Sequence, residues 1–219
     1  LFDRSDWPWV MRREPGDRQD LYFFGHGHEY KQALADFIKV AGRIPMPPRY
    51  VFGLWWSRYW SYTDEEFKDL VGQYEKFGIP LDVLVVDMDW HLTFDLRWHK
   101  RVTDQAGQRL GWTGYTWDKN LFPDPDGFLR WCRNKGLNVT LNLHPASGIQ
   151  PHEEVYPLIA KAMGIDPGTQ KFIPFDLIDK KFARNYFDMA LRLLERQGVD
   201  FWWMDWQQWD TTRVPTLNP

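Results

Sequence analysis

A carboxylate at the end of an apolar run is the first candidate for chemistry in this sequence. Residues 199 to 204 are mostly apolar and lead directly into Asp205, with Trp203 before it and Trp206 after it. An apolar run of this kind is typical of a parallel strand covered on both faces. Because ligands bind beyond the carboxyl ends of such strands, Asp205 is a candidate catalytic group. The two indoles offer flat surfaces suited to a sugar ring.

A second group of acids follows another apolar run. Residues 82 to 86 end at Asp87, Met88 and Asp89, and His91 comes soon after. Such acids could hold the hydroxyls of a sugar. The alternation of Asp87, Asp89 and His91 could also bind a divalent metal, as in the Asp-x-Asp of a nucleotide-sugar glycosyltransferase. The residues alone leave both interpretations open.

Two further runs also end in polar or aromatic groups. The run at 50 to 56 leads to Trp56 and Arg58, and the run at 138 to 143 leads to Asn142 and His144. The residues therefore predict strands at 50 to 56, 82 to 87, 138 to 143 and 199 to 204.

Helix signals lie between these strands. Thr63 and Glu66 form a capping box, Asp124 precedes a proline suited to a first helical position, and Asp179 can cap a third helix. Helical spacing of apolar residues also predicts a lead-in helix over 29 to 41.

Strands joined by helical crossovers predict a parallel sheet. An open doubly wound sheet usually carries a glycine-rich phosphate turn, and this sequence has none. Candidate functional groups at successive strand ends favour a (β/α)₈ TIM barrel, which needs about 250 residues for its eight strands. The fold class expected is therefore α/β, with this chain supplying the first four βα units.

Composition bounds the remaining possibilities. The 219 residues are 43% apolar and carry a net charge of −3 with the two signs interspersed, which argues against a nucleic-acid partner. No run of about 18 apolar residues occurs, so no membrane span is expected. A single cysteine, Cys132, is consistent with a reducing compartment such as the cytoplasm.

The ordered motifs resemble those of glycoside hydrolase family 31. They are Trp-Trp-Ser-Arg at 55 to 58, Asp-Met-Asp-Trp at 87 to 90, Trp-Asp at 117 to 118, Phe-Pro-Asp-Pro at 122 to 125, Leu-His-Pro-Ala at 143 to 146 and Trp-Met-Asp-Trp at 203 to 206. The resemblance implies a retaining exo-α-glycosidase that uses no metal or other cofactor and binds an oligosaccharide or α-glycoside. It also implies that residues 1 to 28 end a preceding β-sandwich module or linker, and that 29 to 219 form the N-terminal half of the catalytic barrel.

The resemblance assigns roles to individual residues. Asp205 matches the nucleophile, and Asp87 matches the aspartate that binds hydroxyls in the −1 subsite, with Met88 touching the ring. The other residues expected around the substrate are Trp56, Arg58, Asp89, Asn142, His144, Trp203 and Trp206. The acid/base of the family follows the sixth strand, so this piece alone is expected to be inactive and to need the remaining half of the barrel.

This chain departs from the family pattern beside the expected nucleophile. His144 stands where the family often has aspartate, Asn142 stands where an apolar residue commonly lines the pocket, and Gln207 and Gln208 replace an Asn-Glu ending. These changes predict a polar site unlike that of the common α-glucosidases. A non-catalytic carbohydrate-binding fragment with the same pocket wall remains an alternative, as does the metal-dependent glycosyltransferase.

Overall fold

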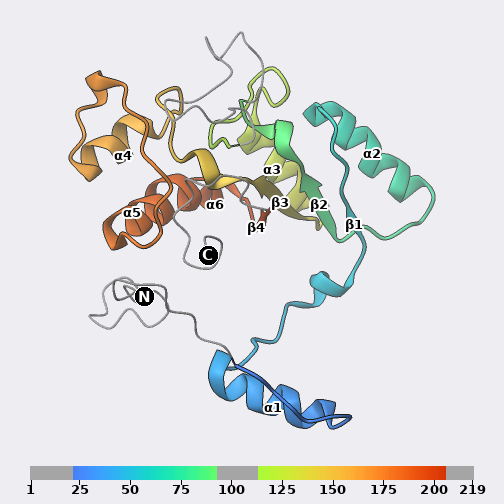
Figure 1. Cartoon of the computed structure of the whole chain (residues 1–219). Coiled ribbons are helices and arrows are strands. Elements are labelled where there is room, and N and C mark those ends of the chain that lie inside the picture. The colour runs from blue at the N-terminus through green and yellow to red at the C-terminus, as the bar shows by residue number, and fades with distance from the viewer. Residues whose placement is uncertain (1–21, 93–112, 206–219) are drawn as a thin grey trace.

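Four parallel strands form the single sheet found in residues 22–92 and 113–205, which are the residues that the computed structural model describes. Their order in space is their order in sequence: β1 (Trp55–Trp56), β2 (Val83–Val86), β3 (Asn138–Leu143) and β4 (Phe201–Met204) (Figure 1). All three pairings are parallel. The predicted wall of a (β/α)₈ barrel is therefore confirmed.

Helices connect the strands as the sequence signals indicate. The crossovers contain α2 (Asp64–Lys76), then α3 (Pro125–Asn134), then a longer segment with α4 (Tyr156–Met163), α5 (Lys180–Asn185), the π-helical η5 (Tyr186–Leu191) and α6 (Arg192–Gln197). Short 3₁₀ turns lie at η1 (Arg49–Phe52), η2 (Met88–Trp90), η3 (Pro145–Ser147) and η4 (Pro167–Thr169).

The predicted helix caps are present. The Thr63 hydroxyl accepts from the Glu66 N–H at 3.1 Å while the Glu66 carboxylate accepts from the Thr63 N–H at 2.8 Å. The Asp124 and Asp179 carboxylates accept from the N–H groups of Gly127 and Lys181. These side chains satisfy backbone donors that have no partner inside the helix.

The first strand is shorter than predicted, and the prediction of a strand over 50 to 56 is wrong for its first five residues. Asp82 explains the difference, because its carboxylate accepts from the Leu54 N–H at 3.0 Å. The same carboxylate fills the space that a side chain on Gly53 would need. This contact bends the chain just before Trp55, so the aromatic run begins as η1 and pairs only at its end.

The two faces of the sheet have different roles. Alternate strand residues point toward the helices and form the main core, with Leu84, Val86, Val139 and Leu141 packed against α2, α3 and α6. Cys132 of α3 is fully buried in this core. The other residues of each strand point to the opposite, concave face, which would be the inside of a barrel.

Aromatic rings from the two outer strands meet across the concave face. The Trp55 ring lies 5.4 Å from Phe201 and 6.2 Å from Trp203, and Tyr50 stacks on Phe201 at 5.6 Å. In a flat sheet, three spacings of about 4.8 Å would separate β1 from β4. The ring contacts therefore agree with a sheet that curls as a barrel wall does. We call Tyr50, Trp55, Phe201 and Trp203 the concave-face cluster.

The chain before the sheet is less closely packed. Helix α1 (Tyr30–Ala41) contains no buried residue and stands apart from the sheet at the end of an extended segment (Figure 1). Residues 1 to 21 lie outside the described part, so the β-sandwich or linker expected at 1 to 28 stays a prediction. Within the described residues, no helix has the length and apolar character needed to cross a membrane.

Candidate active site

The carboxyl ends of the last three strands bring four polar side chains onto the concave face. Asn142 pairs with Trp203 in the register of β3 and β4, and His144 and Asp205 follow directly after those strands. Asp87 follows β2 and caps η2. Because side chains alternate along a strand, all four point to the same side.

Asp205 is held from the neighbouring strand. The Asn142 side-chain amide donates to Oδ2 of Asp205 at 3.3 Å, and Nε2 of His144 lies 3.7 Å from the same oxygen. The Asn142 and His144 side chains are almost fully buried, whereas the Asp205 side chain is 36% exposed. Asp205 is therefore a partly accessible carboxylate on a rigid, buried support.

Asp87 lies in the same electrostatic field. Burial raises the pKa of its carboxyl above the ordinary value, and the carboxylates of Asp205 and Asp89 raise it further. The Met88 N–H, 2.8 Å from Oδ1, and the His144 ring lower the pKa without cancelling the rise. Such a carboxyl in a site of like charges is typical of functional positions.

Asp89 and Met88 have partners of a different kind. The Asp89 carboxylate accepts a hydrogen bond from the Ser61 hydroxyl on the loop after β1. Met88 is buried within η2, and its N–H serves Asp87. The contact with Ser61 was not foreseen from the sequence, because no local spacing links residues 28 positions apart.

Two candidate residues at the end of β1 do not join this group. Trp56 packs edge-on against Tyr74 of α2 at 6.0 Å, on the helix-facing side of the sheet, because its neighbour Trp55 occupies the concave side. Arg58 lies over the Trp60 ring at 5.0 Å. The expectation that Trp56 contacts substrate is therefore corrected. Trp203 does face the concave side and is 39% exposed, and Trp206 lies outside the described residues.

A buried acid that the sequence did not reveal joins the loops around the site. Glu153, after β3, accepts from the Thr116 hydroxyl at 2.6 Å and from the Tyr115 N–H at 3.1 Å. The Thr116 hydroxyl in turn accepts from the Glu154 N–H at 2.9 Å. Burial alone would raise the pKa of Glu153, but His152, Thr116 and His91 more than offset it, so the pKa lies below its ordinary value.

The loop after β2 is also fixed by a histidine. His91 is fully buried, and its Nδ1 lies 3.0 Å from the Leu92 carbonyl oxygen. Burial lowers the pKa of this ring, so it is uncharged at neutral pH. Gly114 packs so closely against the ring that a Cβ would lie 2.2 Å from Nδ1. A glycine is therefore required for the two parts of the loop to meet.

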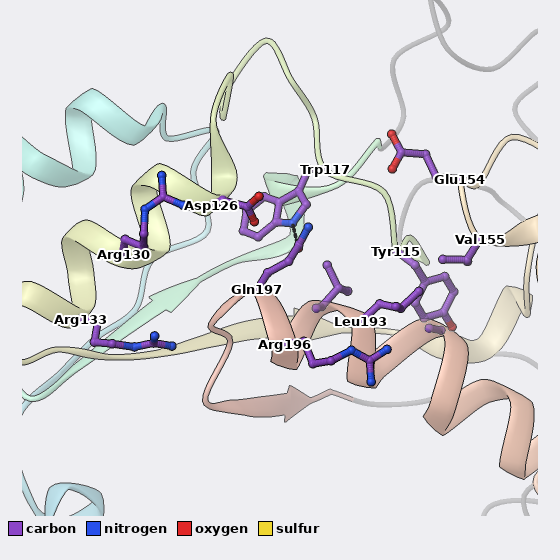
Figure 2. A pocket seen from close by; sticks show the side chains of 12 residues that line it. Tyr115, Trp117, Asp126, Arg130, Arg133, Glu154, Val155, Leu193, Arg196 and Gln197 are labelled. Atoms are coloured by element: carbon purple, nitrogen blue, oxygen red, sulfur yellow. Dashed lines mark hydrogen bonds between the residues drawn. The ribbon is translucent and has the colours of Figure 1, made fainter.

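A pocket of about 650 Å³ opens on the helix side, between α3 and α6, and not at the strand ends (Figure 2). Trp117 donates from its indole to Gln197 there at 3.1 Å and is only 4% exposed. None of the described candidate residues lines this pocket. We take the strand ends as the candidate site, because Asp87 and Asp205 lie there beside the buried Asn142 and His144 side chains.

The described residues contain no group of side chains suited to a metal ion. Across residues 22–92 and 113–205, no three His, Cys, Asp or Glu side chains are grouped so that they could hold a metal ion. Asp87 lies near Asp205, whereas Asp89 accepts a hydrogen bond from Ser61.

The fold and these strand ends define a (β/α)₈-barrel domain whose acids lie at the carboxyl ends of its strands. The family model described as "Glycosyl hydrolases family 31 TIM-barrel domain" matches residues 44–217. The chain therefore belongs to glycoside hydrolase family 31.

Alignments with relatives from this family cover most of the chain. The α-xylosidase of Saccharolobus solfataricus is 25% identical over 88% of this chain and 23% of its own length. A probable glucan 1,3-α-glucosidase of Oryza sativa is 28% identical over 90% of this chain and 19% of its own length. A dextranase structure from Flavobacterium johnsoniae aligns with a TM-score of 0.57 at 19% identity, covering 81% of this chain and 21% of the other. The chain thus spans about a quarter or less of these proteins.

Proposed function

We propose that the chain is the N-terminal half of the catalytic barrel of a retaining exo-α-glycosidase. The longer polypeptide, which we call the full-length enzyme, would hydrolyse a terminal non-reducing α-linked sugar through a covalent glycosyl-enzyme. Family membership supports this proposal. The observation that carries it is the Asp205 carboxylate, which lies at the end of β4 and is held by Asn142 and His144.

Asp205 is the proposed nucleophile. Retaining hydrolysis requires two carboxyl groups about 5–5.5 Å apart, one to attack the anomeric carbon and one to protonate the leaving oxygen. A partly exposed carboxylate at the end of a strand can attack without a separate base. The proton donor is proposed to come from the remaining half of the barrel.

Asp87 is proposed to hold sugar hydroxyls in the −1 subsite. Its raised pKa also makes Asp87 a candidate proton donor, a role that would compete with the binding of hydroxyls. Trp203 and Met88 would form walls of the subsite beside these acids. The oligosaccharide or α-glycoside is the proposed substrate class, and the names of the relatives support testing aryl α-xylosides and α-glucosides first.

The test is a substitution combined with covalent labelling in the full-length enzyme. Asp205→Asn keeps the size of the side chain and removes its charge, so we expect turnover to be abolished while substrate binding is retained. A slow-leaving fluorinated glycosyl probe should label Asp205, as found by peptide mass mapping. Labelling of Asp87 or Asp89, or near-normal turnover in Asp205→Asn, would contradict the assignment.

Two other classes give different results in the same assays. A carbohydrate-binding fragment without catalysis would bind the sugar and take up no label even when the barrel is complete. A metal-dependent glycosyltransferase would lose activity with a chelator and regain it with Mn²⁺ or Mg²⁺. The proposed glycosidase should be unaffected by chelation, because carboxylates stabilise its oxocarbenium-like transition state.

A further inference from the structure

The support of Asp205 comes from two side chains on one strand. Asn142 and His144 lie on the same face of β3, and both approach Oδ2 of Asp205, at 3.3 and 3.7 Å. Both are 2% exposed, whereas the carboxylate that they approach is partly open. One oxygen of the carboxylate is therefore held from the protein side.

The backbone around these two residues is fixed. The Trp90 indole donates to the Asn142 carbonyl at 2.9 Å, and the Asp205 N–H donates to the Leu143 carbonyl at 3.0 Å. Pro145 follows His144 and restricts its backbone conformation. The imidazole thus has little freedom to move away from Asp205.

We propose that His144 is a positioning residue for Asp205 and that its uncharged ring is the working form. A neutral ring, whose Nε2 lies 3.7 Å from Oδ2, limits where the carboxylate can lie without placing a charge beside it. Protonation of the ring slows the attack on the anomeric carbon. This inference rests on the proposed function, in which Asp205 is the nucleophile.

The chemistry of the first step explains the effect of charge. A carboxylate oxygen forms a bond to the anomeric carbon, the bond to the leaving oxygen breaks, and the general acid protonates that oxygen. The negative charge of Asp205 disappears as the ester forms. An imidazolium beside it stabilises the starting carboxylate more than the ester, so it raises the barrier.

The surroundings of His144 favour its uncharged form at neutral pH. The charged groups facing it are Asp205 after β4 and Asp87 after β2, and the buried His91 ring is also within electrostatic reach. Burial lowers the pKa of His144, and the two carboxylates raise it without restoring the ordinary value of 6.5. Activity should therefore be present above the pKa of His144 and lost as the pH falls through it.

The test compares pH profiles of kcat/KM for the full-length enzyme on an aryl α-glycoside. His144→Gln retains an N–H donor that cannot be protonated, so its acidic limb should move to lower pH. Below the pKa of the histidine, the ratio of variant to wild-type kcat/KM should rise as the pH falls, by up to about tenfold for each pH unit. Asn142→Ala is the comparison variant. It removes an uncharged donor to Asp205, so it should lower kcat/KM without moving the acidic limb to lower pH as His144→Gln does.

A second variant tests the proposed function separately from the role of His144. In Asp205→Gly, added azide can attack the anomeric carbon in place of the carboxylate and form a glycosyl azide. Rescue by azide supports Asp205 as the nucleophile, independently of the role of His144. Absence of rescue counts against the proposed function itself.

The inference is overturned if a folded His144→Gln enzyme keeps the wild-type acidic limb while azide rescues Asp205→Gly. Far-ultraviolet circular dichroism and the thermal midpoint establish folding. If the glutamine variant does not fold, His144→Asn serves as the second uncharged donor, with the same expected shift and the same contrary result.

Discussion

At the scale of single residues, two acids two positions apart have different surroundings. Asp87 is half-buried near Asp205 and has a raised pKa, whereas Asp89 accepts a hydrogen bond from Ser61. Asp87 accepts from the N–H of its own neighbour Met88, whereas the partner of Asp89 is a side chain from another loop. The difference supports the proposal that Asp87, and not Asp89, binds the sugar.

We therefore expect Asp87→Asn to reduce kcat/KM of the full-length enzyme far more than Asp89→Asn. A hydrogen bond to a charged group contributes about 1.5–3 kcal/mol, which corresponds to a loss of roughly tenfold to 150-fold. Asp89→Asn is the matched control and should cost less than tenfold, because its contact is with Ser61. Equal losses in the two variants would instead favour the Asp-x-Asp metal site.

The sequence could indicate which residues follow strands, but not which of them meet. Asp87 and Asp205 were identifiable because each follows an apolar run. The contact of Asn142 with Asp205 depends on the register of β3 and β4, which is set by hydrogen bonds between distant residues. Trp56 was misplaced for a related reason, since a shift of one residue moves a side chain to the other face.

At the scale of elements, the loops after β2 and β3 are joined by one buried carboxylate. Glu153 accepts from Thr116 and Tyr115, and Thr116 continues the network to the Glu154 N–H. Replacing one member of a buried network leaves its partners unsatisfied. These loops flank the candidate site, so their order should affect substrate binding.

Glu153→Gln should lower the free energy of unfolding by about 1–3 kcal/mol, because a buried acceptor is replaced by an amide that also carries donors. The pKa of Glu153 is lower when folded, so its stabilisation is present above the ordinary value of 4.5 and is lost as the pH falls through the lower folded value. Denaturant unfolding of the full-length enzyme across this range measures the effect. The exposed Glu154→Gln is the control, and an equal loss in both variants would contradict the prediction.

Helices were easier to predict than strand ends. Caps such as Thr63 with Glu66 act within one turn, so the sequence contains the whole signal. The start of β1 depends instead on the Asp82 side chain reaching Leu54. A local apolar pattern cannot include a partner 28 residues away, which is why the first strand was predicted too long.

At the scale of the whole molecule, the concave-face cluster presents aromatic surface where a closed barrel would continue. Trp203 is 39% exposed and Met204, at the edge strand, is 52% exposed. An open sheet edge beside apolar side chains favours association with another strand. The chain alone therefore has a surface that the remaining half of the barrel would cover.

We expect residues 1 to 219 alone to bind the dye ANS strongly, to self-associate and to be inactive. Co-expression with the remaining half as a separate polypeptide should reduce dye binding and restore hydrolysis, because the cluster and the edge of β4 become covered. Dye fluorescence, sedimentation and an aryl α-glycoside assay measure these outcomes. A monomeric chain with little dye binding would contradict the prediction.

Because Cys132 is buried, the rate at which it is alkylated can report how often the core opens. Burial raises the pKa of this thiol to about 12, with the Asp200 carboxylate acting in the same direction, so the thiolate that reacts with alkylating reagents is scarce in the folded state. The sequence contains no other cysteine. Alkylation of this chain in the completed barrel should therefore proceed only through transient separation of α3 from the sheet. Its rate would measure how often that helix detaches under native conditions, without a denaturant or an introduced label.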